Sequence, residues 1–228
     1  GVTQGGVDSS DLFAFFIDTL DEEIRATAAG SWAGIPIVGA DAGPDEDVAR
    51  LAVLKHADDT VLVAESEQQL QILARALEKW CSKWQVAPNP SKCQVVVFER
   101  SGNTQPCVLL GGILLEVVKE VVYLGFVLHK RGTWSQHVNR RIQKGGKWDA
   151  CAERLVGKSG GCTVEVAATV RAATAETSTL YGCELWAGGS SASLMSRVDK
   201  HQARVGRRVL GVRDSAEAEG VLSELGWM

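Results

Sequence analysis

The alternation of hydrophobic and polar positions predicts an α+β protein, with strands and packed helices first and a helical region after them. Two apolar runs rich in Val and Leu, 51–54 and 61–64, flank a polar break at 56–60. Each run has the length and composition of a buried strand, so together they predict a tight hairpin. Other apolar runs predict an edge strand at 34–38, a strand at 93–98, a hairpin at 108–118 turning on two glycines, and a strand at 121–128.

The first half also contains two helical patterns. Apolar residues at helical spacing predict a helix around 12–20. Ser66 and Gln69 form a capping box before a second helix, whose apolar stripe includes Trp80 and Trp84. Because both Trp residues lie on the stripe, we expect both in the core.

From Trp134 onward the pattern is helical. We expect a basic helix at 135–156, an Ala-rich helix at 163–180 and a third helix at 192–210. His137, at helical distance from two arginines, is expected to be a surface residue rather than a metal ligand. The change of pattern predicts two domains, 1–129 and 130–228.

Composition limits the class of protein. A chain of 228 residues with 45% hydrophobic content can bury a core. It shows no secretory signal and no apolar run of about 18 residues, so we expect an intracellular protein that does not span a membrane. The six Cys show no C-x-x-C pair, which favours reduced core thiols over disulfides or zinc. The chain begins with Gly1 rather than Met, which indicates a fragment or a processed product.

The net charge of −4 conceals an asymmetry, because acidic residues dominate up to about Glu99 and basic runs follow. Such an asymmetry indicates either polyanion binding by the basic part or ordinary solvated helix faces. The basic positions are Lys130, Arg131, Arg140, Arg141, Lys144, Lys147, Arg154 and Lys158, then Arg197, Lys200, Arg204, Arg207, Arg208 and Arg213.

Asp58 and Asp59 at the hairpin tip are the strongest candidates for chemistry. Neighbouring side chains alternate along a strand, but at a turn two adjacent carboxylates can face one site. Such a pair favours a shared cation, and its hard oxygen ligands suit Mg²⁺ (or Mn²⁺) completed by substrate phosphates. The alternative is a solvated acidic turn, since Asp is a common turn residue.

The surrounding residues resemble the reverse transcriptases of non-LTR (LINE-like) retrotransposons. Ala57-Asp58-Asp59 is followed by Thr-Val-Leu and Ala-Glu-Ser, as in that family, while His56 replaces the usual aromatic residue. The opening Gly-Val-Thr-Gln-Gly is similar to the block that precedes this hairpin. Tyr-Gly-x-Glu-x-Trp at 181–186 and Glu-Leu-Gly-Trp at 224–227 continue the family's order.

The resemblance implies roles for particular residues. Asp58 and Asp59 would be the catalytic, metal-binding acids, and Gln4 and Gly5 would line the pocket for nucleotide and template. Asn89 and Lys92 fit an Asn-x-x-Lys block, where Lys92 either stabilises the leaving pyrophosphate or is a solvated turn residue. The primer grip would be Tyr123, Leu124 and Gly125. The nucleic-acid backbone would contact Arg140, Arg141, Lys144 and Lys147.

The implied fold is a partial polymerase palm, an antiparallel sheet with packed helices, followed by a helical thumb or connection. The implied reaction is two-metal addition of deoxynucleotides to a DNA primer on an RNA template. Family members supply another Asp from an earlier strand, so we expect this chain alone not to polymerise. The alternatives are a nucleic-acid-binding remnant without catalysis and, with less support in motifs, a metal-dependent nuclease.

Overall fold

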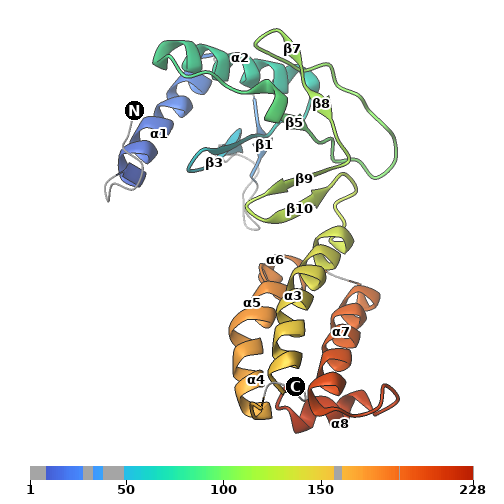
Figure 1. Ribbon diagram of the computed structural model, residues 1–228. Coiled ribbons are helices and arrows are strands. Elements are labelled where there is room, and N and C mark those ends of the chain that lie inside the picture. The colour runs from blue at the N-terminus through green and yellow to red at the C-terminus, as the bar shows by residue number, and fades with distance from the viewer. Residues whose placement is uncertain (1–8, 28–32, 38–48, 157–160, 190, 228) are drawn as a thin grey trace. The chain divides into compact units, whose positions relative to one another are not determined.

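The chain forms two compact units, Gly1–Leu124 and Gly125–Met228, in a computed structural model (Figure 1). The described residues are 9–27, 33–37, 49–156, 161–189 and 191–227. Helices and short strands share unit 1, and helices dominate unit 2, which makes the protein α+β. None of the described helices is long and apolar enough to cross a membrane.

In unit 1, helices α1 (Ser9–Thr27) and α2 (Glu67–Trp84) pack against each other and against one face of a hairpin. The hairpin consists of β3 (Val53–His56) and β4 (Asp59–Leu62). The buried core that joins the two helices comprises Ile17, Leu20, Ile24, Leu73, Ala76, Trp80 and Cys81, with Val53 and Leu62 packed against it. Apolar burial therefore anchors the hairpin to both helices.

The ends of α2 follow local signals, with one difference at each end. The Ser66 hydroxyl accepts a hydrogen bond from the Gln69 backbone N–H (3.2 Å), as expected of a cap. The Gln69 side chain, however, accepts from the backbone N–H of Glu65 rather than that of Ser66. The expected core position of Trp84 is wrong, because this residue in the last turn is 42% exposed, with its ring edge-on to Phe16.

The other face of α2 covers several short strands. Its Ala74 packs with Val95, Val108 and Leu110 in a second cluster. The Gln71 amide completes the edge of one strand, since its oxygen accepts from the Leu109 N–H (2.8 Å) and its nitrogen donates to the Leu109 carbonyl (3.0 Å). The elements here are η1 (Pro90–Lys92), β5 (Gln94–Val95), β6 (Leu109–Leu110), β7 (Ile113–Leu114) and β8 (Glu116–Val117).

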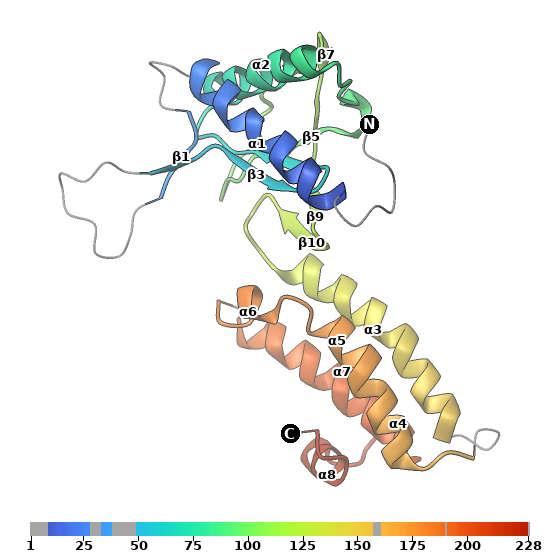
Figure 2. The same ribbon diagram turned by 90° about the vertical axis from the view of Figure 1, so that its left-hand side faces the viewer.

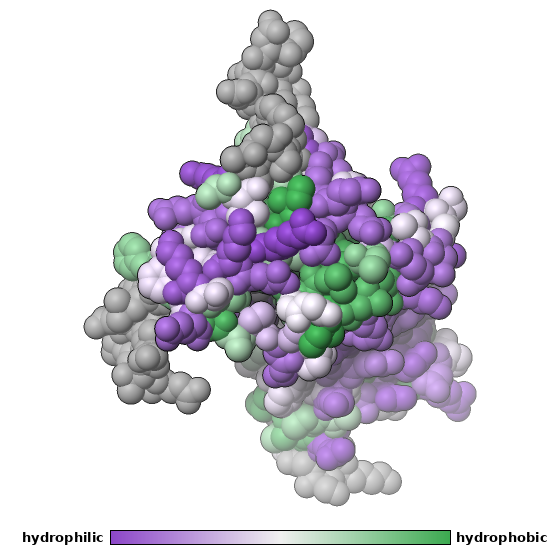
Figure 3. Space-filling model, turned by 90° about the horizontal axis from the view of Figure 1, so that it is seen from above, coloured by the Kyte–Doolittle hydropathy of each residue, from purple (hydrophilic) through white to green (hydrophobic). Residues whose placement is uncertain are grey.

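The strands form two-stranded pairs in the described residues rather than the single antiparallel sheet we expected. β6 and β7 pair across Gly111 and Gly112, as predicted, and β1 (Ile35–Pro36) pairs with β2 (Arg50–Leu51). β5 and β8 run parallel. Ile113 and Leu114 of β7 are 55% and 58% exposed, and Figure 3 shows an apolar patch on the face seen from above.

The strand predicted at 121–128 is interrupted. β9 (Glu120–Tyr123) ends before Leu124 and Gly125, which both have positive φ (47° and 82°), and β10 (Phe126–His129) begins after them. Consecutive residues with positive φ are typical of tight hairpin turns, so the apolar run contains a turn that hydrophobicity alone does not reveal.

Unit 2 is built from helices that lie side by side in both ribbon views (Figure 2). Helix α3 (Ser135–Val156) packs against α4 (Val164–Arg171), η2 (Ala172–Glu176), α5 (Thr177–Thr179) and α7 (Ala192–Leu210). The predicted bounds of α3 and α7 are confirmed. The Ala-rich helix is also present, but a π-helical segment, η2, interrupts it. The remaining helices are α6 (Cys183–Trp186) and α8 (Ala218–Glu224).

Candidate functional site

The acidic pair lies at the tip of hairpin β3–β4. Register pairs His56 with Asp59 and Lys55 with Thr60, which leaves Ala57 and Asp58 as the two central turn residues. Ala57 has φ of +49°, a conformation that a two-residue hairpin turn requires at its first central position and that a non-glycine residue rarely adopts. The hairpin predicted from the apolar runs is therefore confirmed, and its turn is tight and specifically shaped.

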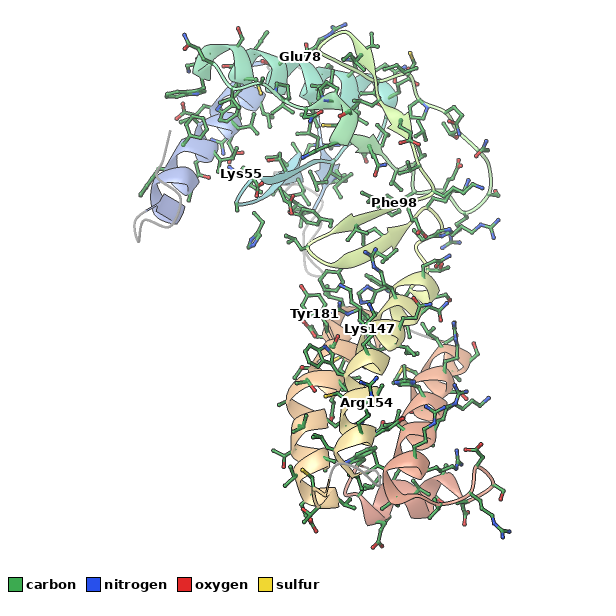
Figure 4. The ribbon with its side chains drawn as sticks, viewed as in Figure 1. Lys55, Glu78, Phe98, Lys147, Arg154 and Tyr181 are labelled. Carbon is green, nitrogen blue, oxygen red and sulfur yellow. The ribbon has the colours of Figure 1, made fainter. Side chains whose placement is uncertain are left out.

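The two faces of the hairpin have different environments. Val53, Lys55 and Leu62 share the face that packs toward the helices, where the Lys55 ammonium contacts Asp18 and Asp21 of α1, each at 2.9 Å. Figure 4 shows Lys55 on this hairpin. Burial alone lowers the pKa of Lys55, but hydrogen bonds and the charges of the two aspartates outweigh it and raise the pKa above its ordinary value. The cation nearest the turn in sequence is thus already neutralised.

Asp59 lies on the opposite face of the hairpin, and Asp58 lies in the turn itself. Both side chains are exposed, and neither makes an ion pair or hydrogen bond with the described residues. An exposed, unneutralised pair of carboxylates fits the oxygen ligands that Mg²⁺ prefers, with water and phosphate completing the shell. In the part of the chain that the structure describes, no third acidic, His or Cys side chain joins the pair to make a fuller ligand set.

Tyr123 at the end of β9 is electrostatically coupled to this pair. Burial raises the pKa of its hydroxyl, and the negative charge of Asp59 raises it further. A tyrosine is already protonated at neutral pH, so the phenol near the acids can donate a hydrogen bond. The structure thus brings one residue of the expected primer grip close to one residue of the expected catalytic pair.

The other predicted site residues of this region lie in the turn after β9, at the end of η1, or outside the residues that the structure describes. Gln4 and Gly5 lie outside the described residues. Leu124 and Gly125 form the turn after β9, and Lys92 is an exposed residue at the end of η1, where Asn89 caps the helix by accepting from the Ser91 N–H (3.2 Å). In the described part of the chain, no hydrogen bond or ion pair links Lys92 to the acidic pair.

In unit 2, the outer face of α3 carries a basic stripe, which we define as Arg140, Lys144, Lys147 and Arg154. These residues recur at intervals of three, four or seven positions, so they share one helix face. All four are exposed, and none makes an ion pair among the described residues. Figure 4 shows Lys147 and Arg154 along this helix. Arg154 was not among the expected site residues, although its spacing of seven from Lys147 would have indicated it.

Arg141 does not lie on that face. It is 7% exposed, and its guanidinium lies 4.1 Å from the centre of the Tyr181 ring. Burial lowers the pKa of Arg141, while the Tyr181 partner raises it. The position of Arg141 is set by α3, which buries residues 137, 138, 141 and 145 against the rest of unit 2.

The surface position predicted for His137 is wrong, because its side chain is fully buried. Its Nδ1 accepts from the Val127 backbone N–H (3.2 Å), so its Nε2 carries the proton and faces the Tyr181 carbonyl (3.4 Å). Its ring stacks on Phe126 at 5.2 Å. Burial lowers the pKa of His137, the Tyr181 carbonyl raises it, and nearby arginines lower it. His137 therefore ties β10 to α3 as a neutral imidazole.

Comparison with known proteins gives the same family as the motifs. Residues 1–128 match the family model described as "Reverse transcriptase (RNA-dependent DNA polymerase)". The chain is 26% identical over 221 residues to the RNA-directed DNA polymerase from mobile element jockey of Drosophila melanogaster, a match covering 92% of this chain and 22% of that protein. It is 29% identical over 138 residues to the protein of the same description from Drosophila funebris, covering 60% and 14%. The chain thus spans at most 22% of these relatives' lengths. No solved structure matches it significantly.

Proposed function

Because this chain belongs to the reverse transcriptase family of non-LTR retrotransposons, we propose that its hairpin β3–β4 carries two carboxylates of a polymerase active site. The observation that supports this most directly is the tip of the hairpin, where Asp58 and Asp59 are exposed and lack a neutralising partner in the described residues. In this proposal unit 1 corresponds to part of a polymerase palm, and unit 2 to a thumb or connection.

Asp58 and Asp59 would hold divalent metal, Mg²⁺ or Mn²⁺, through their carboxylate oxygens. When bound, the metal would activate the primer 3′-hydroxyl and stabilise the departing pyrophosphate. The helices behind the hairpin hold the acids in place, because Val53 and Leu62 anchor both strands in the core. Tyr123, whose hydroxyl is sensitive to the charge of Asp59, would donate a hydrogen bond at the primer end.

The basic stripe on α3 would contact the phosphates of the template–primer duplex. Four exposed cations without ion-pair partners in the described residues are free to pair with phosphates, and helix geometry spreads them over about 21 Å. Such contacts hold a duplex without reading its sequence. The proposed partners are therefore an RNA template, a DNA primer and deoxynucleoside triphosphates.

We also propose that this chain alone does not extend a primer. Two-metal catalysis needs more ligands than two adjacent carboxylates, and the described residues bring no further acid to the pair. His56, where the family has an aromatic residue, changes the surroundings of the pair as well. Binding of a duplex through α3 requires neither metal nor catalysis, so the alternative of a nucleic-acid-binding remnant predicts metal-independent binding and no metal at the hairpin.

Mn²⁺ binding tests the proposal directly, with the free ion measured by electron paramagnetic resonance. The chain should bind Mn²⁺, and the paired change Asp58→Asn with Asp59→Asn should abolish that binding. Asp214→Asn, which alters an exposed aspartate in unit 2, is the matched control and should bind as the unchanged chain does. Equal Mn²⁺ binding by the paired variant and the control would overturn the metal site.

Primer extension on an RNA template with Mg²⁺ tests whether this chain alone can extend a primer. We expect no incorporation by this chain and incorporation by a longer chain that adds a third acidic ligand, lost again on Asp58→Asn. Incorporation by this chain alone, abolished by Asp58→Asn, would contradict its proposed incompleteness while supporting the site.

A further inference from the structure

A second basic surface, unused by the proposed function, lines a groove between α7 and α8 in unit 2. The groove has a volume of about 560 Å³, within the range of ligand sites in proteins. Its polar lining consists of Lys200, Arg204, Arg207, Arg208, Asp199 and Asp214, and its apolar lining of Ala203, Ala218 and Leu222. It therefore combines four cations, two carboxylates and an apolar floor in one concave surface.

The walls of this groove are held by close packing. A Cβ built on Gly206 would lie 2.8 Å from Val221 and 3.0 Å from Leu225, so α8 approaches α7 where a side chain is missing. The Arg207 Nε donates to the Ala216 carbonyl (2.8 Å), which fixes the connection between the two helices. The groove is thus largely pre-formed, which lowers the entropic cost of binding.

The four cations of the groove differ in whether they already have a partner within the protein. Arg207 is half-buried against the loop, and Arg208 pairs with Glu153 at 3.3 Å. Lys200 and Arg204 are exposed, and neither has an ion-pair partner among the described residues. The Arg204 guanidinium and the Lys200 ammonium, in a concave site and without an ion-pair partner in the described part of the chain, suit a phosphate group, which Arg can bind with two parallel hydrogen bonds.

The groove and the α3 stripe lie on separate faces of unit 2. On α3 the residues that form ion pairs with α7 are Asp149 and Glu153, and Val138 packs in one cluster with Leu194 and Val198 of α7; these α3 residues lie about half a turn around the helix from the stripe. The stripe therefore faces away from α7. On α7 the ion pairs to α3 come from His201 and Arg208, whereas Lys200 and Arg204 lie roughly a quarter turn away, beside α8.

We propose that the α7–α8 groove binds a single-stranded nucleic-acid segment while the α3 stripe holds a duplex. A convex duplex suits an exposed helix face, but a concave site of this size receives one strand. Lys200 and Arg204 would pair with its phosphates. Asp199 and Asp214 would accept hydrogen bonds from the Watson–Crick edges of base amino groups, which in a duplex are already paired with the opposite strand.

Fluorescence anisotropy of a labelled single-stranded RNA of about 12 nucleotides tests this, in the presence of saturating unlabelled RNA–DNA duplex that occupies the stripe. The strand should still bind. Changing Lys200→Ala with Arg204→Ala should reduce the slope of log K against log salt by about 1.4, at about 0.7 per phosphate contact. Lys83→Ala on α2, an exposed lysine that belongs to neither basic surface, is the matched control and should leave that slope unchanged.

Three results would each overturn the groove proposal. These are complete displacement of the strand by duplex, an unchanged salt slope in the paired variant, and displacement by a poly-glutamate peptide at equal charge concentration, which would indicate an acidic-peptide site. If duplex does not bind at all, the duplex role of the stripe falls, whereas the Lys200 and Arg204 variants still report on the groove.

Discussion

The salt dependence of duplex binding gives the sharpest measure of the basic stripe on α3. Its four exposed cations have no ion-pair partner among the described residues, so each can release one counterion from a phosphate. Four contacts predict a slope of log K against log salt of about −3.6, and so a loss of affinity of about 150-fold between 50 and 200 mM salt. Lys147→Ala should reduce the slope to about −2.7.

Fluorescence anisotropy of a labelled RNA–DNA duplex over that salt range provides the measurement. Lys83→Ala is the matched control, since Lys83 is an exposed lysine on α2 that does not belong to the stripe, and its loss should not change the slope. Alkylation of Cys151 gives an independent readout, because this exposed thiol shares the helix face with Lys147 and Arg154. Bound duplex should slow its alkylation but not that of Cys107 in unit 1. A slope unchanged by Lys147→Ala, with Cys151 unprotected, would refute the assignment of the stripe.

The packing of α3 supports three further predictions, each read from urea unfolding followed by circular dichroism. Gly145→Ala should lower the free energy of unfolding by about 1–3 kcal/mol, because the added Cβ would lie 1.9 Å from a threonine hydroxyl. Gly146→Ala is the matched control: its Cβ would lie 3.8 Å from the nearest neighbour, so this change should raise the free energy of unfolding by up to about 1 kcal/mol. Equal effects of the two changes would contradict the packing. Burial lowers the pKa of His137, so unfolding takes up a proton below about pH 6.5. The free energy of unfolding should therefore fall as pH drops through that value, by at most about 1.4 kcal/mol per pH unit. His137→Gln should flatten this dependence of stability on pH, and an unaltered dependence would exclude His137 as its source. Asp149→Asn should lower the free energy of unfolding by about 3–5 kcal/mol, because Asp149 is the buried partner of Arg171 (3.1 Å), whose other acidic partner, Glu176, is 43% exposed and lies at 3.5 Å. A decrease below about 1 kcal/mol would show that Glu176 or solvent compensates the Arg171 charge.

Local sequence signals account for the elements that need no distant partner. The bounds of α3 and α7 follow from helical periodicity alone, and the β3–β4 hairpin follows from two apolar runs around a short polar break. Both patterns act within a few residues along the chain. The acidic pair could be located for the same reason, although its catalytic role stays a prediction.

Tertiary packing decided what periodicity could not. His137 and Arg141 look like members of a basic surface, yet both are buried, because Phe126 and Tyr181 from other parts of unit 2 cover them. Trp84 shows the reverse, since the stripe that predicts its burial continues past the point where partners cover α2.

The sequence by itself determined the helices, the acidic hairpin and the family, because these depend on neighbours along the chain and on short motifs. The tertiary structure alone decided which cations remain free on α3, that Tyr123 lies near Asp59, and that Gly206 lets α8 close against α7 to form a groove. Burial and electrostatic pairing are properties of residues far apart in sequence, so no local pattern encodes them.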